Sequence, residues 1–479
     1  MTFTLLHISD LHRAESDPIG NAELLSTLLA DGERARREHP AIGAPDAIIV
    51  TGDLVQGVRL GHPDPETELS AQWQVAGAFL ARLADELLEG DRSRLVVVPG
   101  NHDVDWNEAR AAMQPVADDD LPDNFSPAMC GPLNDLRWNW RERRAYRIVD
   151  RATYAARLAR FGALIDTFYD GVDIVRTPLY RMHSLLDERI VVVAFDSCVG
   201  NDCFAAHGAI AEEALAQAHM DLRRAPYELH VAAWHHSIHG EPGASDYMSV
   251  STVDRLIGKG FRLGLHGHQH RAAAANRYVH LPEQEMMAVV SAGSLCAGAR
   301  GLPVGVNRQY NLIELDDELT TARVHVREMA IATNFAPARR AELGFQSHID
   351  LEWTLPADLQ ERRREHETEL TMQAERANAE GRFDVAEGIL RRLSTGPGSY
   401  ARSLLVIALR EQNAWRRLAD ALQEPDSIAE LVEGAQALTQ AGAFDEAERY
   451  VEAHCGRTGL PGATAVELEN MITAGRSVA

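Results

Sequence analysis

The chain has 479 residues, 45% of them hydrophobic and 25% charged, which is ordinary for a globular protein and long enough for roughly two to four domains. Its formal net charge of −24 opposes non-specific binding to a polyanion, although divalent cations can reverse the local field for a phosphate group. No apolar run reaches the ~18 residues of a membrane span, no basic and apolar leader is evident, and the five cysteines are scattered, so we expect a cytoplasmic protein without membrane contact.

The N-terminal part of the chain alternates short apolar runs with longer amphipathic stretches. Each apolar run is shorter than about ten residues and is followed by turn residues, as buried strands are. The predicted elements are strands within residues 1–12, at 46–50 and at 95–98, with helices at 22–38 and 66–88 between them. This alternation predicts βαβ units and a mostly parallel sheet.

From about residue 104 to residue 189 the alternation stops, and Pro, Asp and Asn mix with aromatic residues and a basic run. We interpret this segment as an inserted, partly helical cap. Regular strands then return with little helix between them. They are predicted at 190–195, 229–234, 261–265, 288–295, 310–315 and 322–327.

After about residue 341 the strand signals end, and Ala, Glu, Arg and Leu dominate. Phe383, Trp415 and Phe444 stand in three similar stretches about 30 residues apart, close to the period of helical-hairpin repeats. The region therefore resembles a short tetratricopeptide-like array, although the middle copy lacks the Gly-x-Phe-x-x-Ala pattern of the other two. An irregular helical bundle is the alternative interpretation.

Polar residues of one chemical kind follow the predicted strands. Asp10 and His12 are two residues apart, so they point the same way and can reach one ion if the strand continues to its tip. Ligands of open α/β sheets bind beyond the carboxyl ends of the strands, and packing does not explain so many metal-competent side chains there. Glycines beside them permit sharp turns and close backbone approach. The residues are Asp10, His12, Asp53, Asn101, His102, His235, His268 and His270, with Gly52, Gly100 and Gly267.

These residues form five motifs that match, in order, those of the calcineurin-like metallophosphoesterases, which the chain resembles over about residues 1–330. The motifs are Asp10-x-His12, Gly52-Asp53, Gly100-Asn101-His102-Asp103, His235-His236 and Gly267-His268-x-His270. Within the family the chain looks like the bacterial cyclic-nucleotide-phosphodiesterase-like branch, except that Ser237 replaces the proline that often follows the paired histidines there. The resemblance implies a four-layer α/β/β/α sandwich, which we place over residues 1–340 with the cap at about 104–189. The change in composition predicts an all-α domain over residues 341–479.

The resemblance further implies a site for two divalent cations, each of them Mn, Fe, Zn or Co. Asp53 would bridge the ions, with Asp10, His12 and His270 completing the first and Asn101, His235 and His268 the second. A metal-bridging hydroxide would attack the phosphorus. His102 would act as general acid, oriented by Asp103, while His7, His236 and His266 are expected to be structural or to support the ligands.

The expected cap concentrates arginine and aromatic residues in an otherwise acidic chain. Guanidinium groups bind phosphate in a forked geometry, and aromatic rings stack on bases. We therefore expect Arg143 and Arg144 to grip a nucleotide or the end of a nucleic acid, the alternative being arginines that are merely solvated or ion-paired. The basic run comprises Arg137, Arg141, Arg143, Arg144, Arg147, Arg151, Arg157 and Arg160, interleaved with Trp138, Trp140, Tyr146 and Tyr154.

Several functions remain open on the sequence alone. A phosphodiesterase acting on a nucleotide or related diester is the first hypothesis, and a nuclease acting on DNA or RNA ends is the second. A phosphomonoesterase would use the same ligands. Because helical repeats present surfaces to protein partners, residues 341–479 could instead make the chain a scaffold or a phosphoesterase effector recruited by a partner.

Overall fold

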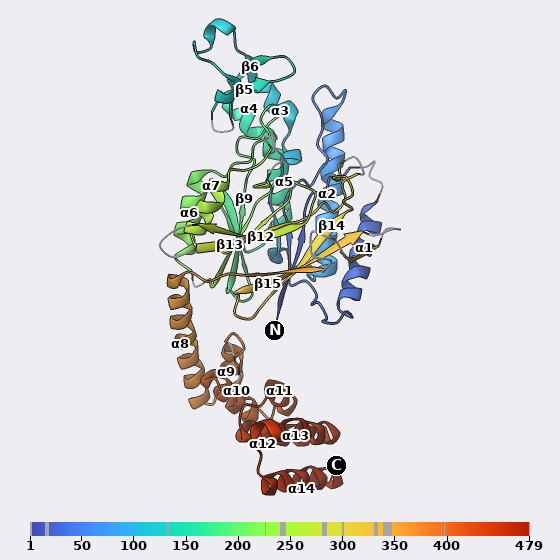
Figure 1. The fold of residues 1–479 in the computed structure, drawn as a ribbon, viewed down its shortest axis with the longest axis vertical. Helices are drawn as coiled ribbons and strands as arrows, with labels where there is room; N and C mark the ends of the chain where they lie inside the picture. The colour runs from blue at the N-terminus through green and yellow to red at the C-terminus, as the bar shows by residue number, and fades with distance from the viewer. Residues whose placement is uncertain are drawn as a thin grey trace. The chain divides into compact units, whose positions relative to one another are not determined.

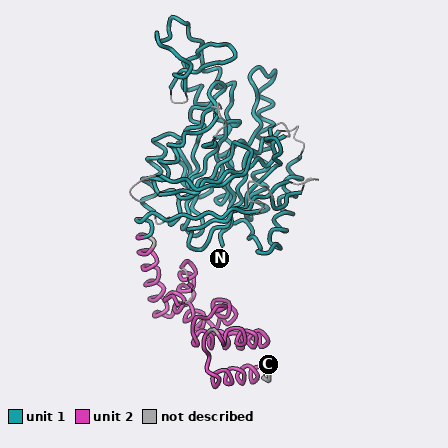
Figure 2. Tube along the Cα trace, in the orientation of Figure 1, with its two compact units in different colours: residues 1–360 teal, residues 361–479 magenta. Residues whose placement is uncertain are grey.

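The computed structural model describes residues 2–14, 19–131, 134–225, 227–239, 246–279, 285–298, 301–329, 334–338, 347–393, 395–396 and 398–478. The chain forms two compact units, Met1–Gln360 and Glu361–Ala479 (Figure 2), whereas the sequence placed the boundary after residue 340. The difference arises because β17 (His348–Glu352) pairs with β15 (Thr321–Met329), and Leu351, Trp353 and Leu355 are buried behind it. No helix in the described part of the chain is long and apolar enough to cross a membrane.

Unit 1 is built on two seven-stranded sheets (Figure 1). The first has the order β16-β15-β14-β1-β2-β3, with β17 beside β15, and the second has the order β12-β13-β11-β10-β9-β8-β7. Strands β1, β2 and β3 are parallel to one another, as are β9, β10, β11 and β13. The bounds in the first sheet are β1 Phe3–Ile8, β2 Ala47–Val50, β3 Leu95–Val97, β14 Gln309–Leu315 and β16 Phe335–Pro337. Those in the second are β7 Val175–Arg176, β8 Tyr180–Leu185, β9 Ile190–Phe195, β10 Leu229–Ala233, β11 Leu263–His266, β12 Ala273–Val279 and β13 Glu285–Ser291.

The side chains of the parallel strands alternate between two cores, which stacks the molecule in four layers. Leu5 and Ile49 point into the core between the sheets, while Leu6 and Ile48 point outward to a helical layer. That outer layer contains α1 (Asn21–Ala35), α2 (Pro65–Leu87) and α5 (Ala159–Phe168), and the second sheet is covered by α6 (Glu212–Leu222) and α7 (Val250–Gly258). The expected α/β/β/α sandwich is confirmed (Figure 1).

Helix α2 shows how the sequence determines an outer-layer element. Asp64 caps its N-terminus by accepting a hydrogen bond from the backbone N–H of Thr67, and Pro65 occupies the first turn, where its missing N–H costs nothing. Its buried side chains recur at helical spacing and bury one face against the first sheet; they include Leu69, Trp73, Ala76, Phe79, Leu80 and Leu83.

The cap is smaller than the sequence indicated. Strand β8 pairs with β9 in the second sheet, and α5 packs on the first core, so the C-terminal part of the expected 104–189 insertion belongs to the main fold. The remainder projects from one end of the sandwich (Figure 1). It is a three-stranded sheet of order β4-β6-β5 with two short helices. Their bounds are α3 Trp106–Ala111, β4 Met113–Pro115, β5 Leu136–Asn139, β6 Arg144–Ile148 and α4 Arg151–Ala155.

The described part of unit 2 is helical, with three closely similar hairpin turns. Each turn has one residue with positive φ, namely Gly381 (75°), Asn413 (54°) and Gly442 (74°). The next residue donates its backbone N–H to a carbonyl in the preceding helix, at 2.8 Å from Arg382, 2.9 Å from Ala414 and 2.9 Å from Ala443. The second helices of the hairpins then begin at Phe383, Trp415 and Phe444. The helices are α8 Ala357–Ala379, α9 Phe383–Leu390, α10 Tyr400–Glu411, α11 Trp415–Ala421, α12 Ile428–Gln440, α13 Phe444–Thr458 and α14 Gly462–Val478.

Candidate metal centre

The loops that follow β1 and β2 bind each other through their backbones. The N–H of Asp10 donates to the carbonyl of Gly52 at 3.0 Å, and the N–H of His12 donates to the carbonyl of Asp53 at 2.9 Å. Strand β1 ends at Ile8, so the strand does not continue through Asp10 and His12 as the sequence argument assumed. The two side chains nevertheless meet, because these bonds between the loops set their directions.

Five of the proposed ligands have left-handed backbone conformations, which are unusual for residues other than glycine. Each such conformation costs on the order of 1–3 kcal/mol and persists only where the surroundings enforce it. The φ angles are 53° at Asp10, 44° at His12, 52° at Asp53, 77° at His268 and 52° at His270.

Two glycines allow the loops to approach this closely. A Cβ at Gly267 would lie 1.8 Å from Ser9 Oγ and 2.7 Å from Asp10 Oδ2. Gly52 has a φ of +91°, and a Cβ there would lie 2.6 Å from His235 Nδ1. Both distances are below van der Waals contact, so side chains at these positions would displace the proposed ligands.

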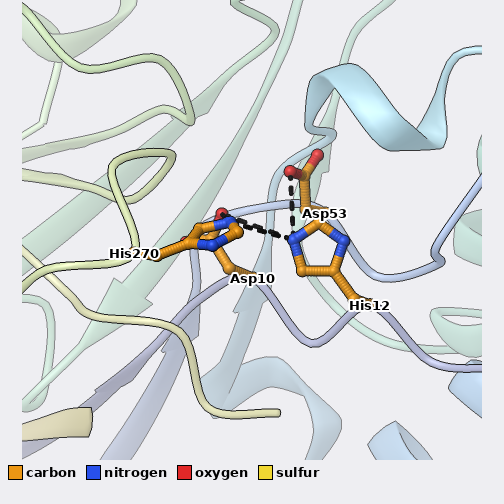
Figure 3. Close-up of side chains that lie close together, drawn as sticks. All are labelled: Asp10, His12, Asp53 and His270. Carbon is orange, nitrogen blue, oxygen red and sulfur yellow. Dashed lines mark hydrogen bonds and ion pairs between the residues drawn. The ribbon is translucent and has the colours of Figure 1, made fainter. Parts of the chain in front are cut away.

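The side chains of Asp10, His12, Asp53 and His270 form one compact cluster, with one potential ligand atom from each within 4.8 Å of all the others (Figure 3). His12 Nε2 lies 3.0 Å from His270 Nε2, and His270 Nε2 lies 3.2 Å from Asp10 Oδ1. Asp10 Oδ2 accepts the backbone N–H of His268, whereas Asp10 Oδ1 is buried and faces the ring of His270. Buried lone pairs that converge in this way fit a divalent cation.

A second set of atoms converges on the other side of Asp53. Asn101 Oδ1 lies 2.9 Å from both His235 Nε2 and His268 Nδ1, and the two nitrogens are 3.2 Å apart. Asp53 Oδ1 accepts the N–H of His102, which leaves Oδ2 at 3.4 Å from His235 Nε2 and 3.7 Å from His12 Nε2. Asp53 Oδ2 thus faces both sets, as a bridging ligand must.

Burial and charge oppose each other in this cluster. Burial lowers the pKa of His270, yet the Asp10 carboxylate raises it to about 9, and the same balance with Asp53 raises the pKa of His235 to about 9. Burial alone would raise the pKa of Asp10 and of Asp53, but the histidines hold both below the usual range. The metal-free cluster is therefore held by imidazolium–carboxylate pairs, which a divalent cation would replace with release of protons.

Comparison with known proteins agrees with this geometry. A family model described as calcineurin-like phosphoesterase matches residues 3–272, more than half of the chain. The chain belongs to the calcineurin-like phosphoesterase family. This membership and the cluster together support divalent metal ions as cofactors and phosphoester hydrolysis as the class of activity.

The solved structures to which the chain is similar are distant from it in sequence. A structure of PhoD has 10% identity over 74% of this chain and 72% of that one, with a TM-score of 0.40. The calcineurin-like phosphoesterase YfkN from Bacillus subtilis has 13% identity over 76% and 96%, with a TM-score of 0.32. A Vps29 mutant from Entamoeba histolytica has 10% identity over 74% and 100%, with a TM-score of 0.22. No curated protein matches the chain.

The sequence predicted a contact between Asp103 and the ring of His102, but the structure shows different partners for both residues. His102 Nδ1 lies 2.7 Å from the backbone carbonyl of Gln56 instead. Asp103 accepts backbone N–H groups, from Leu54 at 2.8 Å and Val55 at 3.1 Å on Oδ1 and from Gly100 at 2.8 Å on Oδ2. Burial, reinforced by the Asp53 carboxylate, raises the pKa of Asp103 to about 8. Asp103 therefore joins the loops and does not orient the imidazole.

Other groups around the cluster act on the ligand rings. The carbonyl of Thr51 lies 2.7 Å from His235 Nδ1, which turns Nε2 toward the site. Asp246 Oδ2 lies 3.5 Å from His268 Nε2, on the side away from the ligand atoms. These groups were not predictable from the sequence, because a backbone carbonyl has no side-chain signal and Asp246 belongs to no motif. His236, bound to Ser197 and Asn201, is buried behind the ligands.

The arginines of the expected cap fall into two classes. Arg137 and Arg157 are buried and bind Asp202 and backbone carbonyls, while Arg151 and Arg160 form ion pairs with acidic residues. The guanidinium groups of the other four are exposed and have no ion pair or hydrogen bond among the described residues. These four are Arg141, Arg143, Arg144 and Arg147, all on the β5–β6 hairpin.

Proposed function

We propose that the chain is a two-metal phosphodiesterase that hydrolyses a nucleotide or related diester. The observation that carries the proposal is the position of Asp53 Oδ2, which faces His12 on one side and His235 on the other. Asp10, His12 and His270 are the proposed ligands of one ion, and Asn101, His235 and His268 those of the other. The native ions are proposed to be Mn, Fe, Zn or Co, because the donors mix imidazole nitrogen with carboxylate and amide oxygen.

When bound, the two cations would polarise the phosphoryl oxygens and supply an activated water at neutral pH. Among the protein's own groups, His102 is the proposed general acid for the leaving oxygen. Its Nδ1 donates to the carbonyl of Gln56, so Nε2 is the atom left to transfer a proton. Its ring packs edge-on against His12, with 4.6 Å between centroids, so it lies beside the proposed ligands.

Asp103 is proposed to act through the backbone. By accepting N–H groups from the Gly52-Asp53 loop and from Gly100, it fixes the distance between Asp53 and Asn101. This replaces the orienting role that the sequence suggested for it, and it places Asp103 among the positioning residues.

A panel of substrates and metals tests the proposed function. Protein stripped of metal and reconstituted separately with Mn, Fe, Zn or Co is assayed on bis-p-nitrophenyl phosphate, p-nitrophenyl phosphate and single-stranded DNA. We expect metal-dependent turnover with preference for the diester over the monoester. Activity that survives complete metal removal, or that Asp53→Asn leaves unchanged, would contradict the proposal.

A nuclease acting on DNA or RNA ends is the second candidate. The four unpaired arginines on the cap hairpin favour it, and Arg143 and Arg144 remain the proposed substrate contacts. Stepwise release of nucleotides from one end of an oligonucleotide would distinguish it from an enzyme for small diesters. The cyclic-nucleotide-phosphodiesterase-like branch is tested in the same panel by adding cyclic AMP and cyclic GMP.

For the C-terminal region we propose a tetratricopeptide-like array formed by the helices of the unit Glu361–Ala479. The support is the hairpin turn that recurs with the same hydrogen bond before Phe383, Trp415 and Phe444. Such arrays present surfaces to proteins, so the phosphoesterase could be an effector recruited by a partner. To test this recruitment, a partner is captured on immobilised full-length protein and the phosphoesterase activity of the complex is assayed. A captured partner that leaves turnover unchanged would contradict a role of recruitment in activity.

A further inference from the structure

The β5–β6 hairpin of the cap carries exposed basic and aromatic side chains that the metal centre does not use. We define this hairpin patch as Trp138, Trp140, Arg141, Arg143, Arg144 and Arg147. Residues 136–148 contain five arginines and one acidic residue, Glu142, in a chain with 71 acidic and 47 basic residues. The net charge of these residues is therefore positive, whereas the net charge of the whole protein is negative.

The hairpin is anchored by the residues that it buries. Arg137 lies within hydrogen-bond distance of Asp202, at 2.5 Å, and of the hydroxyl of Tyr154, at 2.9 Å. Asn139 Oδ1 accepts the N–H groups of Arg141 at 3.0 Å and of Glu142 at 3.2 Å, which orders the turn. The exposed side chains therefore project from a preformed support, so little backbone has to be ordered when they bind.

The aromatic part of the patch is open to solvent. Trp140 is 75% exposed. Its ring stands edge-on to Trp138 with 6.1 Å between centroids, and Trp138 in turn lies 5.7 Å from Phe125. A tryptophan supported in this way and left uncovered offers a face on which a base can stack.

The charged part of the patch lacks internal partners. Glu142, the acidic residue nearest in sequence, accepts a hydrogen bond from the hydroxyl of Tyr146, and the four exposed guanidinium groups are unpaired among the described residues. Screening over about 8–10 Å at physiological salt limits the repulsion from acidic side chains that lie farther away than this. The local field is therefore attractive to phosphates even though the net charge of the protein is −24.

We propose that the hairpin patch binds single-stranded nucleic acid, with the arginines on the phosphates and a base stacked on Trp140. A single strand is favoured over a duplex because only unstacked bases present their faces to a ring. Binding of the strand depends on the hairpin alone, whereas its use as a substrate rests on the proposed function. The cap follows the proposed ligand Asn101 in sequence and projects from the same end of the strands, so a bound strand could continue toward the metal centre (Figure 1).

The test is fluorescence anisotropy of full-length protein in EDTA, with labelled 15-nucleotide DNA and RNA strands of one pyrimidine. Four phosphate contacts predict a slope of about −3 for the logarithm of affinity against the logarithm of salt concentration. The double variant Arg143→Ala, Arg144→Ala should halve this slope and weaken binding at least about 10-fold, since it removes two of the four contacts. Trp140→Ala should weaken binding about 5- to 100-fold and leave the slope unchanged, because stacking carries no charge.

A matched control is available in the same cap. Arg151 is exposed but paired with Asp135 at 2.6 Å. Arg151→Ala removes one positive charge from a different place, half of what the double variant removes, and should change affinity less than about twofold. Equal losses in Arg151→Ala and in the double variant would overturn the proposal, since they would show attraction by net charge alone. Stronger binding to a 15-base-pair duplex, or to vesicles of anionic phospholipid, than to the single strand would also overturn the proposal. Failure to bind the single strand at all would do the same. If the wild-type protein binds the strand but shows no metal-dependent turnover, the result contradicts the proposed function and leaves the binding proposal intact.

Discussion

The candidate metal centre and the hairpins of the C-terminal unit both turn the chain through left-handed backbone, but they use different residues to do so. The hairpin turns place Gly381, Gly442 and Asn413 at the positive φ. Glycine adopts this conformation readily, and asparagine is the side chain that tolerates it next best. These turns are therefore formed by local sequence preference.

The metal centre places aspartate and histidine at the same kind of position, at Asp10, Asp53 and His268 among others. Their conformation opposes local preference and is enforced by bonds from other loops, such as that from the N–H of His268 to Asp10 Oδ2 at 3.0 Å. Backbone strain at the metal centre thus falls on proposed ligands, whereas the three hairpin turns place it on residues that tolerate it. The experiments below test whether this contrast holds.

The largest expected effect comes from changing Asp53 without disturbing its turn. Asp53→Asn keeps a residue that tolerates left-handed backbone but removes the charge shared by the two ligand sets. We expect turnover of a diester to fall by more than about 100-fold, beyond the ~10–100-fold that is typical of residues that only support ligands. Bound metal per protein, measured by atomic spectroscopy, should fall with it.

The control for this change is Asp64→Asn. Asp64 caps α2 at the surface, and asparagine caps helices equally well, so activity and metal content should be unchanged. An Asp53→Asn protein with full metal content and full activity would show that the strained turn serves packing only.

A second test separates the regions by pH, because the positive-φ residues of the metal centre are titratable whereas those of the hairpin turns are glycine and asparagine. In the metal-free protein the pKa of His235 and of His270 is raised to about 9, so their protonated forms stabilise the fold below about pH 6.5 and this contribution is lost as pH rises toward 9. Metal binding needs both rings neutral, so affinity should rise with pH, by up to about 100-fold per unit when two protons are released.

Calorimetric titration with Mn²⁺ in two buffers of different ionisation enthalpy, between about pH 6 and pH 8.5, measures this proton release. Metal affinity that is flat over this range would mean that the two histidines do not bind the ions. Helical content of the C-terminal unit, followed by circular dichroism, should stay constant over the same range.

The sequence predicted which residues gather but not how they are held. The apolar runs ending in Asp10, Asp53 and Asn101 indicated parallel strands, and the carboxyl ends of such strands meet at one edge of a sheet. The left-handed conformation of Asp10 was not predictable, because it depends on the carbonyl of Gly52, a residue distant in sequence. The role of Gln56 was hidden for the same reason, since its backbone carbonyl binds His102.

The arginines of the cap show the same limit of prediction from sequence. Arg137 and Arg143 are equivalent in a basic run, yet one is buried against Asp202 and the other is exposed in the hairpin turn. Pairing across strands decides which face each side chain occupies, and this register was not readable from so irregular a segment. Strand β17 was not readable for the same reason, because it joins its sheet only through tertiary pairing with β15.

A third test compares two glycines. Gly267→Ala inserts a methyl group against Ser9 and Asp10 and should cost about 1–3 kcal/mol of unfolding free energy and weaken metal binding. Gly381→Ala meets no atom within 4 Å but has a φ of +75°, so it should cost about 1–2 kcal/mol and leave metal binding unchanged. Thermal unfolding and metal titration of both variants are the measurements. Weakened metal binding in Gly381→Ala would show that the contrast between the regions is false.

The smallest expected effect concerns Asn413, the residue that departs from glycine in the repeated turn. Its φ of 54° and the bond from the N–H of Ala414 to the carbonyl of Leu409 match the other two turns, so glycine should fit there without other change. Asn413→Gly should alter the unfolding free energy of the C-terminal unit by less than about 1 kcal/mol, because the relief of strain is offset by the greater freedom of glycine in the unfolded chain. Urea unfolding followed at 222 nm measures this. A larger loss would mean that the amide of Asn413 makes a contact specific to the middle hairpin, and that the three turns are not equivalent repeats.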